Sequence, residues 1–257
     1  MKRIFTLRAL FYLLLSLFGM LLGGLFPTPF SSLCHLVFVL LALGAEKAYF
    51  EGEALPRLNF SAVRRAPHLL FLFPIFCFLT LGANLLSSLF AVARGGTLPS
   101  FTPSFSLFLG AVVLAPIAEE ILFRGLLLRL LSAFGEGWAI LLSALLFALA
   151  HGALFQMPYA LTAGLLLGYA AVCGKGLFYP LVFHFLYNLL ALFGDSISPV
   201  LLLAILGGAA LISLIALFCG KRLSPPKWGK APTPGEGLPL LLYGVLMLTF
   251  VFLKELS

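Results

Sequence analysis

Long apolar runs, separated by short breaks of turn-forming residues, are the feature that most constrains this chain. Runs of about 17 to 25 apolar residues recur along it, each long enough to cross a hydrocarbon core of roughly 30 Å as a helix. Of the 257 residues, 62% are hydrophobic and only 10% are charged, which leaves too few polar residues for a soluble surface. The sequence therefore predicts a single all-α, polytopic transmembrane helix bundle over residues 1–257.

Eight or nine spans are expected from the apolar runs and the turn chemistry between them. The candidate helices cover about 9–26, 29–45, 68–93, 104–131, 138–155, 157–173, 177–193, 199–219 and 238–253. Little polar sequence precedes the segment 157–173, so it is the one whose separate crossing stays open. The stretch from Ser224 to Gly237 is rich in Pro and Lys and is expected to be a flexible connector.

The basic residues predict the orientation of the bundle. If the N-terminus is cytoplasmic, 14 of the 16 Lys and Arg residues fall on the cytoplasmic side, all but Arg94 and Lys254, as the positive-inside rule requires. Basic loops that face an anionic leaflet also explain the net charge of +7 without a nucleic-acid partner. A retained first helix is favoured over a cleaved signal peptide, because no small-residue cleavage site closes the first apolar run.

Two adjacent acidic residues, Glu119 and Glu120, lie deep inside the fourth apolar run. A charge at mid-bilayer costs about 2.5–3.5 kcal/mol on insertion scales, so such residues commonly face the protein interior and serve a function. Arg124 follows Glu120 by four residues, which puts both on one helix face and predicts an ion pair. Glu119 is rotated by about 100° and has no partner within its own helix, so we interpret it as a candidate base. A pair that only joins helices is the alternative reading.

Two later spans carry polar residues at helical spacing. Phe147 and His151 are four residues apart in one span, and His184 and Asn188 are four apart in another. Each pair alone is more typical of hydrogen-bonded packing. Together with Glu119 they would supply a base, an imidazole and donors for an oxyanion, the groups that amide hydrolysis needs. The two histidines lie towards opposite ends of their predicted spans, so they meet only if a helix tilts or kinks, or if the helix boundaries differ from those predicted.

These residues carry a family resemblance. The patterns EExxxR at 119–124, FxxxH at 147–151 and HxxxN at 184–188 together resemble the CPBP family, which includes the type II CAAX prenyl endopeptidases and bacterial proteins linked to bacteriocin processing and self-immunity. The resemblance covers Pro116 to Asn188, so residues 104–193 are expected to form the catalytic core. It implies that Glu119 activates water, that His151 positions it, and that His184 and Asn188 stabilise the oxyanion. The supporting residues that it implies are Glu120, Arg124 and Phe147.

A metal site is the alternative to a glutamate mechanism. Glu119, His151 and His184 could hold Zn²⁺, because three protein ligands and a water are the usual catalytic arrangement. The chain has no HExxH motif, which would place a helical zinc pair and its base together. The resemblance favours a mechanism with neither a metal nor another cofactor.

The function expected from these features is that of an intramembrane endopeptidase acting on a membrane-anchored or membrane-delivered polypeptide. The compact, loop-poor chain is typical of a prokaryotic inner-membrane protein. A non-enzymatic bacteriocin-immunity or partner-binding protein that keeps the motifs is the alternative. A proton-coupled transporter is a further one, against which stands the absence of a clear internal repeat.

Two other features are read as structural. His35 lies alone in the second span and is interpreted as a hydrogen-bonded interior histidine. Gly164 and Gly168 are four residues apart, a spacing that permits close contact between helices.

Overall fold

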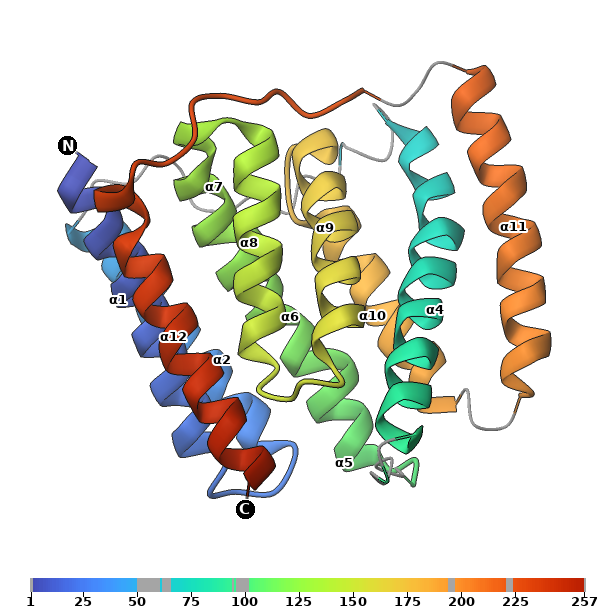
Figure 1. Cartoon of the computed structure of the whole chain (residues 1–257), viewed down its shortest axis with the longest axis horizontal. Helices are drawn as coiled ribbons and strands as arrows, with labels where there is room; N and C mark the ends of the chain where they lie inside the picture. The colour runs from blue at the N-terminus through green and yellow to red at the C-terminus, as the bar shows by residue number, and fades with distance from the viewer. Residues whose placement is uncertain are drawn as a thin grey trace.

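Every regular element in the described part of the chain is a helix (Figure 1). The computed structural model describes residues 2–49, 61, 66–93, 95, 102–193, 197–220 and 224–256. The expected all-α fold class is confirmed. Of the basic residues that predict the orientation, six lie outside the described residues: Arg57, Arg64, Arg65, Arg94, Lys221 and Arg222.

Nine helical runs within those ranges match the nine expected from the sequence. Before the site they are α1 (Lys2–Gly23), α2 (Phe30–Tyr49) and α4 (Leu72–Ala93), the last preceded by the short 3-10 helix η1 (Pro67–Phe71). One continuous run follows, made of α5 (Phe105–Leu107), η2 (Phe108–Leu114), α6 (Ala115–Glu120), η3 (Ile121–Leu127), α7 (Leu128–Leu131) and η4 (Ser132–Phe134). The remaining helices are α8 (Glu136–Ala150), α9 (Met157–Gly174), α10 (Phe178–Phe193), α11 (Pro199–Cys219) and α12 (Pro234–Leu256).

Five of these runs are long and apolar enough to cross a bilayer on length and composition alone: Phe30–Ala48, Pro67–Ala93, Phe105–Phe134, Met157–Gly174 and Pro199–Cys219. Leu7–Gly23, α8 and α10 are apolar but shorter. The chain is therefore an integral membrane protein. The segment 157–173, whose separate crossing was open, is a full helix.

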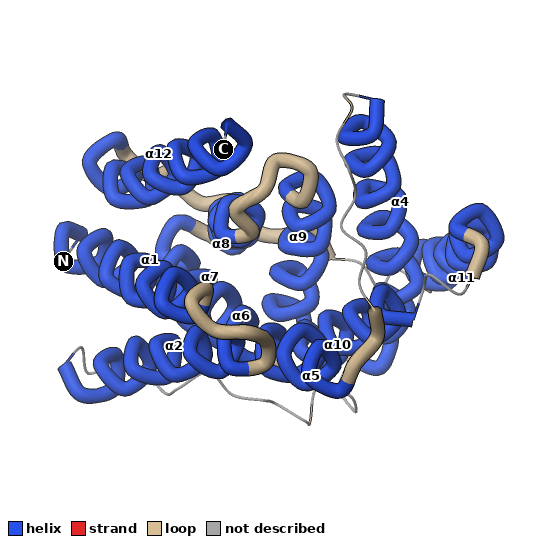
Figure 2. The backbone as a smooth tube through the Cα atoms, turned by 90° about the horizontal axis from the view of Figure 1, so that it is seen from below, coloured by secondary structure: helices blue, strands red, loops and turns tan. Residues whose placement is uncertain are grey.

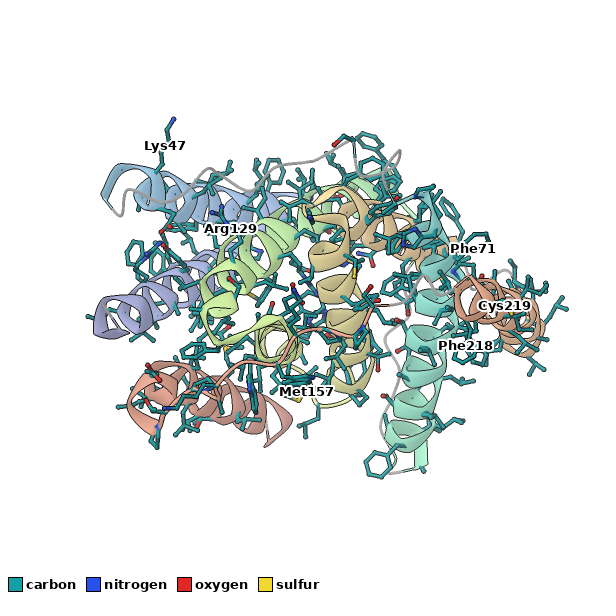
Figure 3. All side chains as sticks on the ribbon, turned by 90° about the horizontal axis from the view of Figure 1, so that it is seen from above. Lys47, Phe71, Arg129, Met157, Phe218 and Cys219 are labelled. Atoms are coloured by element: carbon teal, nitrogen blue, oxygen red, sulfur yellow. The ribbon has the colours of Figure 1, made fainter. Side chains whose placement is uncertain are left out.

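The helices divide into a central group and two edges (Figures 1 and 2). The run Phe105–Phe134 lies centrally with α8, α9 and α10, while α2 packs against α6 and η2. At one edge α1 contacts α2 and α12, and α12 also contacts α8. At the other edge α11 packs against α4 and η1, and its apolar side chains project outward, as Phe218 does at 82% exposure (Figure 3).

The two ends of the chain lie at opposite ends of the bundle (Figure 1). The start of α1, the end of α7 and the segment after α11 share one end. This agrees with the grouping of the basic segments, and the cytoplasmic identity of that end stays a prediction. At this end the carboxylate of Glu46 on α2 is bonded to Arg8 and Tyr12 of α1.

The segment between α11 and α12 is bound to the core, which corrects the expectation of a flexible connector. We call residues Ser224–Thr233 the strap. The hydroxyl of Tyr169 donates to the Ser224 carbonyl at 3.0 Å and accepts from its N–H at 3.2 Å. Glu136 accepts from the Lys227 N–H at 3.0 Å, and the Lys227 carbonyl accepts from Gly137 at 3.1 Å. The Trp228 ring lies directly against Gly137, where any side chain would collide.

Candidate active site

The helix that carries Glu119 and Glu120 is irregular on both sides of them. The π-helix η2 precedes α6 and the π-helix η3 follows it. A π-helix is wider than an α-helix because each N–H bonds the carbonyl five residues back, and such segments occur often at functional sites. Pro116 stands at the start of α6, where it has no N–H to give. The two glutamates therefore lie at the end of a short α-helical stretch between two widened ones.

Glu120 and Arg124 form the ion pair that their spacing predicts. An Arg124 Nη1–H donates to Glu120 Oε1 at 3.0 Å, and both side chains are fully buried. Arg124 also donates to the Gly164 carbonyl of α9 at 3.3 Å and lies over the Phe147 ring, 4.4 Å from its centroid. The guanidinium thus joins three helices while it neutralises one carboxylate.

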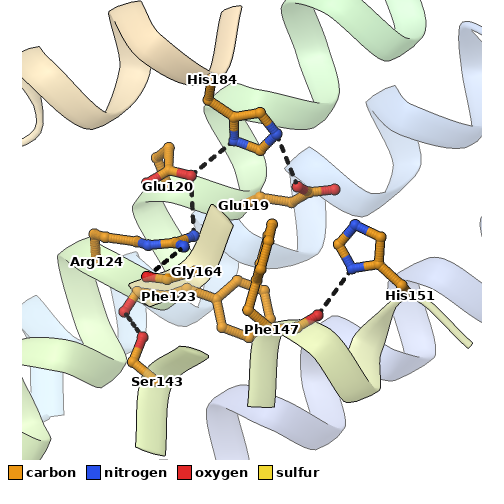
Figure 4. Close-up of polar contacts among 9 residues, drawn as sticks. All are labelled: Glu119, Glu120, Phe123, Arg124, Ser143, Phe147, His151, Gly164 and His184. Atoms are coloured by element: carbon orange, nitrogen blue, oxygen red, sulfur yellow. Dashed lines mark hydrogen bonds and ion pairs between the residues drawn. The ribbon is translucent and has the colours of Figure 1, made fainter. Parts of the chain in front are cut away.

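His184 lies between the two glutamates (Figure 4). Its Nδ1 is 2.8 Å from Glu120 Oε1, and its Nε2 is 3.6 Å from Glu119 Oε2. Because the arginine-paired carboxylate can only accept, Nδ1 carries the proton in this contact. Nε2 is therefore the nitrogen that faces Glu119.

Glu119 differs from its neighbour in both pairing and exposure. Its side chain is 22% exposed, whereas that of Glu120 is fully buried. No arginine or lysine lies within ion-pair distance of Glu119 among the described residues, and its close polar contact is with His184.

His151 enters the site from the end of α8. It is the residue that follows the last turn, and its Nδ1–H donates to the Phe147 carbonyl at 2.9 Å. The other nitrogen, Nε2, is left to accept a hydrogen bond. The His151 ring lies 4.7 Å from the Phe147 ring and 5.7 Å from that of Tyr159, edge to face in both cases.

Phe147 is the centre about which the site is assembled. Its ring lies 4.7 Å from that of His151 and 5.9 Å from that of His184, with Arg124 over its face. The difference in depth expected between the two histidines disappears because α8 ends at Ala150, not near residue 155. A helix of 15 residues is about 22 Å long, which is less than the roughly 30 Å of a hydrocarbon core. The turn that follows stops short of the ends of α4 and α5 (Figure 1).

Asn188 is placed differently from the other predicted residues. Its amide nitrogen donates to the backbone carbonyl of Ala111 in η2 at 2.9 Å. It lies one turn beyond His184 on α10. The structure thus brings Glu119, Glu120, Arg124, Phe147, His151 and His184 together, and bonds Asn188 to the helix that carries the glutamates.

Sequence reasoning missed several contributors. The Gly164 carbonyl accepts a hydrogen bond from Arg124, whereas the sequence indicated only a packing role for this glycine. That packing role is confirmed, because a Cβ at Gly164 would lie 2.9 Å from the Cα and Cβ of Ala144. The buried hydroxyl of Ser143 donates to the Phe123 carbonyl of η3 at 2.8 Å. Both are contacts to backbone carbonyls, which no motif reveals.

The zinc alternative finds no assembled ligand set in the described part of the chain. No group of three His, Cys, Asp or Glu side chains there has an arrangement that could hold a metal ion. His35 is outside the site, with its Nε2 2.8 Å from the Ser16 hydroxyl, so its interpretation as a hydrogen-bonded interior histidine is confirmed.

Comparison with known proteins supports the resemblance seen in the motifs. Residues 100–190 match the family model described as type II CAAX prenyl endopeptidase Rce1-like, which confirms the expected CPBP and CAAX protease family. The matched segment contains all three motifs. No curated protein and no solved structure matches the chain.

Proposed function

We propose that this protein is an intramembrane glutamic endopeptidase, in which Glu119 is the general base that activates water for attack on a peptide bond. The family match supports a membrane protease of the CAAX type acting on a membrane-associated peptide. The catalytic role of Glu119 goes further than that match and rests on the geometry of the site.

The unequal pairing of two neighbouring carboxylates carries the proposal. Glu120 is buried and accepts hydrogen bonds from both Arg124 and His184, so its negative charge is already stabilised by two donors. Glu119 is partly exposed, and its close polar contact among the described residues is with the His184 imidazole at 3.6 Å, which leaves it able to accept a proton from water. Glu120 and Arg124 therefore serve as supports that hold His184 in place.

The two histidines would serve different steps. His151 can accept a hydrogen bond from water at Nε2, because its Nδ1–H is bonded to Phe147. That contact would hold the water beside Glu119, which takes one proton as the oxygen adds to the peptide carbonyl carbon. The same proton then passes to the leaving nitrogen as the C–N bond breaks.

The oxyanion would be stabilised from α10. With both nitrogens protonated, His184 donates through Nδ1 to Glu120 and through Nε2 into the site. Asn188 has a second amide hydrogen beyond the one given to Ala111, and this hydrogen is the further donor. We propose no metal in the reaction.

The substrate we propose is a polypeptide held at the bilayer by a lipid group or an apolar segment. The description of the matched family names prenylated CAAX sequences, in which a lipid on a cysteine near the C-terminus anchors the chain. A farnesylated CAAX peptide is therefore the first synthetic probe, and the same peptide without the lipid is its control.

The decisive experiment compares protein termini in cells. Strains would express the native protein, Glu119→Gln or Glu136→Gln at equal abundance, and new N- and C-termini in membrane and exported fractions would be identified by mass spectrometry. Glu136 is a control because it lies outside the site, at the start of α8. We expect termini that require the native protein or Glu136→Gln and vanish with Glu119→Gln.

Purified protein in lipid nanodiscs gives the second test. Glu119→Gln should lose cleavage of the probe and keep the native unfolding temperature, and chelation of zinc should leave native cleavage unchanged. Cleavage retained by Glu119→Gln would remove this residue from the mechanism. Loss of activity on chelation, restored by added zinc, would favour the metal alternative.

A further inference from the structure

The carbonyl of Ala111 has no hydrogen-bond donor within its own helix, because the residue that would supply the N–H is a proline. In η2 each N–H bonds the carbonyl five residues back, and the last such bond runs from Ala115 to Gly110. The next carbonyl in this register belongs to Ala111 and would need an N–H at position 116, which is proline. The α-helical alternative, Ala115 N–H, is already bonded to Gly110.

A polar backbone group of a membrane-spanning helix needs a hydrogen-bond partner, because lipid offers none. Asn188 of α10 supplies this partner, since its amide donates to Ala111 at 2.9 Å. The acceptor and the donor are 77 residues apart in sequence, so this bond joins two helices. It also allows the helix to pass from the π to the α form at Pro116 without an unsatisfied carbonyl.

The consequence for the site lies in where α10 touches the glutamate helix. Asn188 contacts it before Pro116, and His184, one turn away on the same helix, contacts it after Pro116 at Glu119 and Glu120. Two contacts on opposite sides of a helix irregularity fix both the rotation and the depth of the stretch between them. We infer that Asn188 and Pro116 form one positioning unit, which sets the direction of the Glu119 carboxylate.

If Asn188 and Pro116 act as one unit, the effect of a substitution at Asn188 depends on which residue occupies position 116. Pro116→Ala restores an N–H at the place where the Ala111 carbonyl lacks one. In that background the amide of Asn188 is no longer the only group that can satisfy this carbonyl. Loss of Asn188 should therefore be less damaging when residue 116 is alanine than when it is proline.

The experiment is a double-mutant cycle in purified full-length protein. Native protein, Pro116→Ala, Asn188→Ala and the double variant would be compared by thermal unfolding in one detergent. We expect Asn188→Ala to lower Tm by about 5 °C in the native background, because a half-buried carbonyl then loses its donor, and by less than half of that in the Pro116→Ala background. Equal loss in both backgrounds, or no loss in the native one, would overturn the inference.

Ser143→Ala is the matched control for this cycle. Like Asn188→Ala, it removes a side chain that donates to a π-helix carbonyl, here that of Phe123. This carbonyl keeps its helical partner, the N–H of Leu128. Its loss should therefore have the same effect whether residue 116 is proline or alanine.

Peptide cleavage separates positioning from a purely structural role, and this part rests on the proposed function. We expect Asn188→Ala to lower kcat with little change in KM, and the double variant to recover kcat by about tenfold over Asn188→Ala, since small displacements of reacting groups have large effects on rate. An identical kcat for the two would mean that Asn188 acts only as an oxyanion donor and would overturn the positioning role. The unfolding measurements need no substrate, so they test the unit even if the protein is not a protease.

Discussion

The helix α11 and the run Phe105–Phe134 are both long apolar segments, yet different forces shape them. The first is a regular α-helix of 21 residues at the edge of the bundle, with few buried side chains. The second is broken by two π-helices, and groups from other helices bond its carbonyls and its charges. Hydropathy is a sufficient explanation for α11. The geometry of the central run follows from its partners, and by our inference its irregularity sets the direction of Glu119.

Among the substitutions that test this comparison, one at Arg124 should change the unfolding free energy most. Arg124→Met removes the counter-charge of the fully buried Glu120, and breaking a buried pair in this way typically costs about 3–5 kcal/mol. We expect a matching loss of unfolding free energy in mixed micelles. The paired variant Glu120→Met with Arg124→Met removes both charges and should recover most of the loss. A single variant as stable as the native protein would contradict the view that the pair holds the centre together.

Two neighbouring residues on α11 test whether that helix is held by one face only. Leu217 is fully buried and Phe218 is 82% exposed. Leu217→Ala should cost about 2–5 kcal/mol through lost packing, whereas Phe218→Ala should stay within about 0.5 kcal/mol. Thermal unfolding of the two variants in the same lipid gives the comparison. Similar losses would show that α11 packs on both faces.

Two helical glycines give the smallest expected effects, of opposite sign. A Cβ at Gly164 would lie 2.9 Å from Ala144, and nothing lies within 4 Å of one at Gly208. Gly164→Ala should destabilise the protein by about 1–3 kcal/mol through overpacking. Gly208→Ala should stabilise it by up to about 1 kcal/mol, because alanine favours the helix. Chemical unfolding measures both, and a stabilising Gly164→Ala would show that α8 and α9 separate easily.

Much of the fold could be predicted because apolar length and turn residues are local signals. The range predicted as 199–219 is α11 to the residue. The Glu120–Arg124 pair was equally accessible, since helical spacing alone places the two side chains on one face. The three motifs identified the residues of the site, and the structure brings six of the seven together.

What could not be predicted depends on contacts between distant segments. Hydropathy placed the end of α8 about five residues too late, because Gly152 to Phe155 continue an apolar stretch while the chain turns back there. The role of Phe147 between two imidazoles needs three helices to be in place. The hydrogen bond from Asn188 to Ala111 has one sign in the sequence, the proline at 116. That proline points to the Ala111 carbonyl only once η2 is known to be a π-helix.

The strap has a consequence for how the protein is made. Helices leave the ribosome in chain order, so every residue of the site, from α5 to α10, is synthesised before α12. The last helix reaches α1 only by way of a segment that crosses the ends of α9 and α8. The surface that buries Tyr243 and Met247 is therefore open to lipid until α12 has been synthesised, so α1 contacts α2 well before it contacts α12.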